Sequence, residues 1–207
     1  KVYEEKLLIK KSSLDKENYD ELVFCVRNAE TVTIPDCIEH ICSYAFNGCR
    51  SINTIEFGSE SKLRIIGKFA FSGTRIKSIK IPSKVTLIEE CVFCSCSFLK
   101  QVEFQSDSQL QSIKERAFAF LELESIRIPS QVKHIENYAF GDCYILKNIE
   151  FPDDSELRII DKNALKGSKI DSISIPSKLV ELKDGFFKNM AKVAKINISP
   201  DNQYFKF

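Results

Sequence analysis

Apolar residues recur along the chain in two alternating spacings, and the first of them predicts a series of short β-strands. In each copy the apolar residues stand two positions apart, as in Ile79-x-Ile81 and Ile126-x-Ile128. A period of two is the pattern of a strand with one buried face. The last apolar residue of each copy marks these anchors: Ile34, Phe57, Ile81, Phe104, Ile128, Phe151, Ile175 and Ile198. The steps between anchors alternate between 23 and 24 residues, so we expect eight repeated units with one strand in each.

The second apolar spacing follows each anchor and predicts the segment that returns the chain to the next strand. It consists of two apolar residues three positions apart and then Ala-Phe, as in Val132-x-x-Ile135 before Ala139-Phe140. Five of the six prolines directly follow an anchor, where proline ends a strand. We expect a short helical turn on this return side. A single unit cannot bury its apolar face alone, so stacked units would form a solenoid with continuous apolar columns.

The combined unit Leu-x-x-Ile-x-Ile-Pro-x-x-Val-x-x-Ile-x-x-x-Ala-Phe-x-x-Cys, carried by residues 123–143, resembles the BspA-type leucine-rich repeat. The resemblance covers residues 29–207. It implies a right-handed leucine-rich-repeat solenoid of the β/α type, with a parallel β-sheet on the concave face and short helical turns on the return side. We assign residues 1–28, which are charge-rich and lack the pattern, to an N-terminal cap. Residues 29–207 form the repeat array, whose last unit is truncated.

The charge balance excludes the usual electrostatic partners. Lys and Arg number 30 against 29 Asp and Glu, and 43% of the residues are apolar. Nucleic acids and anionic membranes attract proteins with an excess of positive charge, which this chain does not have. No stretch reaches about 18 consecutive apolar residues, so we expect no membrane insertion within this segment.

The exposed positions of the predicted strands are the candidate binding face. One residue before the five anchors from Phe57 to Phe151, the charges alternate in sign from Glu56 to Glu150, which favours a cross-strand ion ladder. The column and its neighbours hold no aromatic residue of the kind that dominates binding hot spots, so we expect modest affinity raised by repetition. An ordinary soluble surface, whose charges satisfy one another, is the alternative. The predicted binding residues are Lys77, Lys80, Lys100, Glu103, Glu124, Arg127, Lys147 and Glu150.

The eight cysteines and two histidines are weak candidates for chemistry. Cys49, Cys96 and Cys143 stand 47 residues apart in a slot that we interpret as a packing position. Cys91-x-x-Cys94 is a candidate for zinc or redox chemistry, but it lacks a second ligand pair at a suitable spacing. His40 and His134 lie four units apart, which is too far to share a metal, and we expect exposed or edge positions without chemistry.

These patterns favour a non-enzymatic protein-binding module with no cofactor and no metal. No nucleophile, base and orienting residue fall together by register. The resemblance implies a cell-surface or secreted protein that binds a host or extracellular matrix protein, plausibly as an adhesin or surface antigen. The alternative is an intracellular scaffold or spacer in a longer repeat protein, since unpaired cysteines are typical of a reducing cytoplasm. Asn197-Ile198-Ser199 is a sequon for N-glycosylation, although it lies in a predicted strand.

Overall fold

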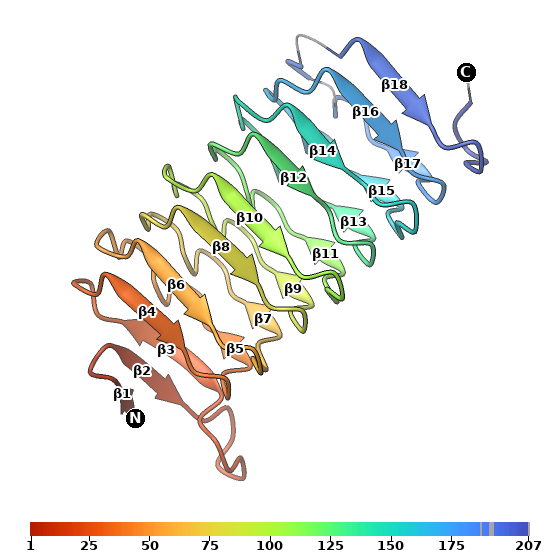
Figure 1. The fold of residues 1–207 in the computed structure, drawn as a ribbon. Coiled ribbons are helices and arrows are strands. Elements are labelled where there is room, and N and C mark those ends of the chain that lie inside the picture. The colour runs from red at the N-terminus through yellow and green to blue at the C-terminus, as the bar shows by residue number, and fades with distance from the viewer. Residues whose placement is uncertain (187, 191–192, 207) are drawn as a thin grey trace.

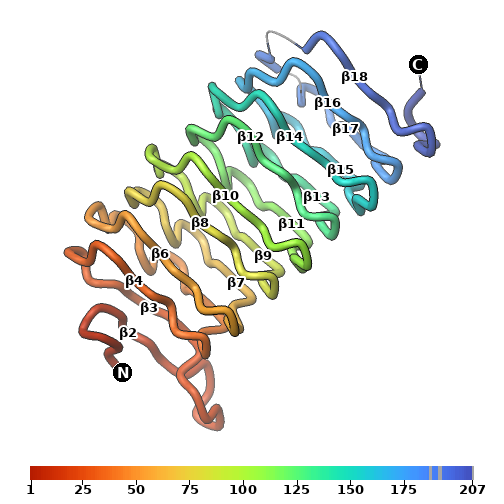
Figure 2. Tube along the Cα trace, in the orientation of Figure 1, coloured from red at the N-terminus to blue at the C-terminus, as the bar shows by residue number. Residues whose placement is uncertain are grey.

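The computed structural model shows a β-solenoid of about eight turns, and it describes residues 1–186, 188–190 and 193–206. The chain advances by one turn per repeat from the N-terminal to the C-terminal end (Figures 1 and 2). The strands that the period of two predicts are confirmed, with one in each turn. They are β4 (Thr31–Ile34), β6 (Thr54–Phe57), β8 (Ser78–Ile81), β10 (Gln101–Phe104), β12 (Ser125–Arg127), β14 (Asn148–Glu150), β16 (Ser172–Ile175) and β18 (Lys195–Ile198).

A second layer of strands runs behind the first, and the sequence analysis missed it (Figure 1). In seven successive turns the apolar-x-x-apolar segment contains a strand of only two residues. These strands pair in parallel from turn to turn and continue the N-terminal strands into one ten-stranded sheet. They are β5 (His40–Ile41), β7 (Ile65–Ile66), β9 (Leu87–Ile88), β11 (Ser112–Ile113), β13 (His134–Ile135), β15 (Ile159–Ile160) and β17 (Glu181–Leu182).

The predicted helical turns on the return side are wrong, because the described residues contain no helix. The Ala-Phe step lies outside the strands, as expected, but in a run of tight turns. There the N–H of Ala45 donates to the carbonyl of Cys42 at 3.2 Å, whereas the N–H of Phe46 donates to Ala70 of the next turn at 2.8 Å. An α-helix needs every N–H to bond within its own segment. The backbone here divides its donors between its own turn and the neighbouring one.

Left-handed backbone conformations at two positions of each return segment prevent helix formation. The first position has φ between 54° and 78° in seven successive turns, and the second has φ between 56° and 75°. A residue with positive φ interrupts a right-handed helix, and only glycine adopts it without a steric cost. The first column is Tyr44, Phe69, Cys91, Arg116, Tyr138, Asn163 and Gly185. The second column is Gly48, Gly73, Ser95, Phe120, Asp142, Gly167 and Asn189.

The core between the two layers is organised around a column of stacked phenylalanines. Five rings from successive turns stack with centroids 5.1 to 5.5 Å apart, and each side chain is fully buried. These rings are Phe46, Phe71, Phe93, Phe118 and Phe140. Leu165 occupies the next slot and is also fully buried. The next copy, Phe187, lies outside the described residues.

The N-terminal segment adds an antiparallel hairpin to the end of the ten-stranded sheet. Its strands are β1 (Val2–Tyr3), β2 (Leu7–Lys10) and β3 (Glu21–Cys25), and β3 pairs in parallel with β5. Leu7, Ile9 and Leu22 are at most 3% exposed, so the hairpin covers apolar side chains of the first turn. The assignment of residues 1–28 to a cap stays a prediction.

Asp20 stabilises the loop of this hairpin through hydrogen bonds from Ser12. Its carboxylate accepts bonds from the backbone N–H of Ser12 at 2.7 Å and from the Ser12 hydroxyl at 2.6 Å, and Lys16 Nζ lies 3.1 Å away. Burial acts to raise the pKa of Asp20, but the two bonds from Ser12 and the ammonium of Lys16 outweigh it and lower the pKa to about 2. The ionised carboxylate therefore stabilises the folded hairpin.

The eight strands β4, β6, β8, β10, β12, β14, β16 and β18 form the front layer, and the seven two-residue strands form the back layer. The front layer is not the single parallel sheet that the sequence predicts. Its strands form ladders only in pairs, β4 with β6, β8 with β10, β12 with β14 and β16 with β18. At two of the junctions between these pairs, a backbone hydrogen bond joins residues that precede the strands. The N–H of Arg75 donates to the carbonyl of Ile52, and the N–H of Lys169 donates to the carbonyl of Leu146, both at 2.9 Å. The interruption follows the alternating unit length, since 11 residues separate Phe46 from Phe57 but only 10 separate Phe71 from Ile81. The chain therefore approaches alternate strands along different paths, and at every second junction the neighbouring front strands form no hydrogen-bonded ladder.

Candidate protein-binding face

The eight predicted binding residues all lie exposed on the front layer. Four of them lie within the strands and point away from the core: Lys80, Glu103, Arg127 and Glu150. The other four stand just before the strands: Lys77, Lys100, Glu124 and Lys147. The structure thus places all eight along one face, where a partner could reach them.

The ion ladder expected on this face forms only in part. Arg127 and Glu150 are aligned on β12 and β14 and make an ion pair. Lys80 and Glu103 are aligned on β8 and β10, but Glu103 accepts a bond from the side-chain amide of Gln101 at 2.5 Å. Between β10 and β12 the ladder is interrupted. Exposed pairs of this kind stabilise a protein by about 0 to 1 kcal/mol each, so most of these charges remain available to a partner.

Ion pairs between successive turns also occur on the back layer, where sequence reasoning did not place them. Lys114 pairs with Glu136 at 2.6 Å, and Asp161 pairs with His134 at 3.1 Å and with Lys183 at 2.9 Å. Burial acts to raise the pKa of Asp161, but its bond to Lys183 and the nearby His134 outweigh it and lower the pKa. His134 therefore contacts a carboxylate that also pairs with Lys183 of the following turn.

His40 occupies the equivalent place four turns nearer the N-terminus, and its Nδ1 lies 3.7 Å from the carboxylate of Glu21. Both histidines begin a two-residue strand of the back sheet. The offset of 22 residues between back-layer positions is the sequence feature that could have revealed the pairs Lys114–Glu136 and Asp161–Lys183.

Three clefts open on the front layer at the junctions where the strands do not pair. They lie between β6 and β8, between β10 and β12, and between β14 and β16, with volumes of about 610, 480 and 370 Å³. Each cleft is lined by a phenylalanine at the end of one strand, or directly after it, and by the proline that follows the next strand along the chain. The pairs are Phe57 with Pro82, Phe104 with Pro129, and Phe151 with Pro176. Phe57 and Phe104 are half-buried, whereas Phe151 is buried.

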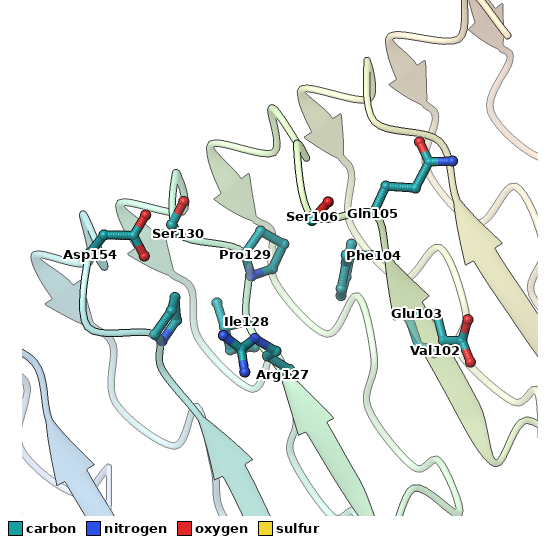
Figure 3. Close-up of a pocket in the computed structure, with 11 residues that line it drawn as sticks. Val102, Glu103, Phe104, Gln105, Ser106, Arg127, Ile128, Pro129, Ser130 and Asp154 are labelled. Carbon is teal, nitrogen blue, oxygen red and sulfur yellow. The ribbon is translucent and has the colours of Figure 1, made fainter. Parts of the chain in front are cut away.

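The central cleft shows how apolar and charged groups are combined. Phe104 and Pro129 stand on opposite sides of it, and Arg127 and Glu103 lie at its strand side (Figure 3). Phe104 is half-buried, and its ring also meets the core ring of Phe118 edge-on with centroids 6.4 Å apart. The strand columns are polar, but the clefts between them carry one phenylalanine each.

Three of the eight predicted residues line these clefts. Glu103 and Arg127 line the central cleft and Lys80 lines the cleft between β6 and β8. The other five lie on the same face but outside the three clefts. The sequence feature that could have found the clefts is the recurrence of phenylalanine at the 47-residue spacing of Phe57, Phe104 and Phe151.

The cysteine column packs as the sequence predicts. The thiols of Cys96 and Cys143 are fully buried and donate to carbonyls of the preceding turn, Phe71 at 3.0 Å and Phe118 at 3.1 Å. Burial raises the pKa of Cys143 to about 12. All eight cysteines are unpaired in this structure.

The Cys91-x-x-Cys94 pair offers no accessible thiolate. Both side chains are buried, and burial raises both pKa values. Cys94 donates to the carbonyl of Arg116 at 3.3 Å. Across the residues that the structure describes, no three His, Cys, Asp or Glu side chains are grouped so that they could hold a metal ion. The same residues include no helix of the length and apolarity needed to cross a bilayer.

Comparison with known families identifies the repeat. The sequence matches the BspA type leucine rich repeat region in six copies, over residues 18–145 and 111–206. The chain belongs to the BspA-type leucine-rich repeat family. A search among proteins of curated function finds no significant match. Membership confirms the resemblance seen in the unit at residues 123–143 and extends it over most of the chain.

Solved structures of bacterial leucine-rich repeat proteins share this fold. A protein from Bacteroides ovatus is 23% identical with a TM-score of 0.60, and the match covers 86% of this chain and 52% of that one. The Treponema pallidum protein TpLRR is 21% identical with a TM-score of 0.59, and the match covers 86% of this chain and 73% of that one. A protein from Eubacterium ventriosum is 20% identical with a TM-score of 0.63, and the match covers 86% of this chain and 46% of that one. This BspA-type chain thus spans about half the length of the Bacteroides ovatus protein, and identities this low establish the fold alone.

Proposed function

We propose that this BspA-type segment is a non-enzymatic protein-binding module that recognises a host or extracellular matrix protein by its front layer. The observation that carries the proposal is the combination of three Phe-lined clefts with exposed charges on one face. Aromatic side chains in partly buried pockets, surrounded by polar groups, are the usual composition of a binding hot spot. Family membership supports a role in protein interaction, and repeat arrays present such extended surfaces without an active site.

Binding by this face would be weak for one cleft and stronger for several together. Each cleft is shallow, so a partner that contacts one of them buries little area. A partner that contacts successive clefts converts later contacts into intramolecular ones and gains affinity without any new type of contact. This property suits a cell-surface adhesin, which is the localisation that we propose from the family.

The test is a charge reversal on the face with a matched reversal on the opposite layer. Immobilised extracellular matrix proteins are probed by biolayer interferometry with the wild-type chain, with Arg127→Glu and with Arg64→Glu. Arg64 is exposed and directly precedes β7 of the back layer, so its variant makes the same change in net charge away from the clefts. We expect Arg127→Glu to reduce the affinity about tenfold at low salt and Arg64→Glu to leave it within about twofold. Equal loss in both variants, or no saturable binding by the wild type, would contradict the proposal.

The second candidate function is an intracellular scaffold or spacer in a longer repeat protein. Its specific support is the set of eight unpaired thiols, since secreted domains usually pair their cysteines. Titration of thiols in the protein purified from its native source separates the two. Eight reactive thiols after unfolding favour the scaffold, whereas disulfides or a glycan on Asn197 favour the surface protein.

A further inference from the structure

We propose that the three clefts of the front layer bind one proline-rich segment in the polyproline II conformation, with every third residue of the ligand in a cleft. This inference deepens the proposed function and rests on the front layer being the binding face. It follows from the spacing of the clefts, from the residues that line them, and from the charges at their rims.

The clefts recur once every two turns of the solenoid. Because neighbouring strands in a sheet lie about 4.8 Å apart, two turns set a cleft repeat of about 10 Å along the solenoid axis. The repeat is regular in the sequence, since Phe57, Phe104 and Phe151 are spaced 47 residues apart and hold the same anchor position in their units. A ligand that lies along the axis must therefore present a side chain about every 10 Å if it is to use all three clefts.

Polyproline II matches this repeat better than the other regular conformations do. It has three residues per turn and rises about 3.1 Å per residue, so one side of it recurs about every 9.3 Å. An extended strand presents same-side residues about every 6.6 Å, which does not fit. An α-helix recurs about every 5.4 Å, so alternate turns would press against the paired strands that separate the clefts.

The lining residues also suit a proline ligand. Each cleft has a phenylalanine on one side and a proline on the other, and proline-rich segments bind in grooves lined by aromatic side chains. A polyproline II ligand is already extended in solution, so it loses less conformational entropy on binding than a flexible peptide. Shallow clefts can therefore give measurable affinity when three of them act together.

The rim charges specify the flanks of the ligand. The cleft between β6 and β8 carries Lys80 and Lys84 against Glu56. The cleft between β14 and β16 carries Asp153 and Asp201. The complementary ligand has acidic residues beside the proline at the N-terminal cleft and basic residues beside the proline at the C-terminal cleft.

The experiment uses a fluorescein-labelled peptide with proline at every third position over three periods, acidic at one end and basic at the other. The control peptide has the same composition with prolines at every fourth position. Fluorescence anisotropy is measured with the wild-type chain, with Phe104→Leu, and with Tyr144→Leu as the matched change at an exposed aromatic outside the clefts. Leucine keeps an apolar contact with the core at Phe104, and circular dichroism confirms that each variant is folded.

We expect the period-three peptide to bind about tenfold more tightly than its isomer. Phe104→Leu should weaken its binding about fivefold to tenfold, and Tyr144→Leu should leave it unchanged. Equal binding of the two peptides, undiminished binding by folded Phe104→Leu, or no binding of either peptide would overturn the inference. If both peptides fail while Arg127→Glu still weakens binding of a matrix protein more than Arg64→Glu does, the proposed function stands and only the polyproline ligand is wrong. If Arg127→Glu and Arg64→Glu weaken that binding equally, the proposed function is wrong as well.

Discussion

Replacing Phe93 by alanine removes the central ring of the stacked column and tests directly what holds successive turns together. Phe93 is fully buried, and its ring stacks on Phe71 at 5.5 Å and on Phe118 at 5.2 Å between centroids. Alanine at this site leaves a cavity between two rings that the backbone ladder holds in place. The turns cannot close over it, because hydrogen bonds such as Phe93 N–H to the Ala117 carbonyl at 3.0 Å fix their spacing.

The expected loss of stability is large for a single substitution. Truncating a buried phenylalanine to alanine lowers the free energy of unfolding by about 3 to 5 kcal/mol. Two stacked contacts, each contributing about 0.5 to 1.5 kcal/mol beyond the buried area, place Phe93 toward the upper end of that range. Leucine occupies the equivalent slot at Leu165, so Phe93→Leu should cost only about 1 to 2 kcal/mol.

Urea unfolding followed by circular dichroism measures both losses. With a slope of about 2 to 3 kcal/mol per molar urea, Phe93→Ala should lower the midpoint by about 1 to 2 M. Tyr144→Ala, which removes a ring that is 59% exposed, is the control and should shift the midpoint by less than about 0.5 M. A Phe93→Ala midpoint close to that of the control would refute the role of the column. Equal losses for alanine and leucine would show that stacking, and not filled volume, determines stability.

Further predictions concern the turns, the hairpin and the thiols. Ser95 has a φ of 63°, so Ser95→Gly removes a steric cost and should raise the free energy of unfolding by up to about 1 kcal/mol. Gly167 has a φ of 75°, and a Cβ there would lie 2.7 Å from Asp142 Oδ1, so Gly167→Ala should lower the free energy of unfolding by more than about 1 kcal/mol. Urea unfolding measures both changes. The pKa of Asp20 is lower in the folded state than its ordinary value of 3.8, so its contribution is present above pH 4 and is lost as the pH falls toward 2. Thermal melts at successive pH values should therefore show a smaller acid-induced drop for Asp20→Asn than for the wild type, and parallel curves would contradict this. A thiol reagent should modify the half-buried Cys37 and Cys42 quickly and the six buried thiols only after unfolding, with mass spectrometry identifying the sites.

The front strands could be predicted because their pattern is long enough to be specific. An apolar residue at every second position, repeated at each anchor from Ile34 to Ile198, is compatible with a strand and not with a helix. The back strands could not be predicted in this way. Two residues are too few for a period of two to show, and Ile38, Ile41 and Ala45 stand at spacings of three and four, which also fit a helix.

The left-handed turns and the side-chain partners were hidden for related reasons. Tyr44, Phe69 and Arg116 adopt a conformation that sequence reasoning assigns to glycine, because hydrogen bonds to the neighbouring turn hold them there. On the face, register correctly aligned Arg127 with Glu150. Register alone did not determine that Lys100 pairs with Glu122 at 3.4 Å, because that partner lies outside the strand columns.

The alternation of 23 and 24 residues accounts for a structural repeat of two turns, and not one, in the front layer. A strictly regular repeat would pair every strand with the next, and the front layer would be a continuous ladder closed to a ligand. The unequal units pair strands two by two and leave a cleft with one phenylalanine at each remaining junction. Every additional 47 residues would then add one cleft, and with it one more contact for a ligand of matching period. Affinity would therefore rise with the number of unit pairs, whereas stability would rise with every unit, because the phenylalanine column runs through both kinds.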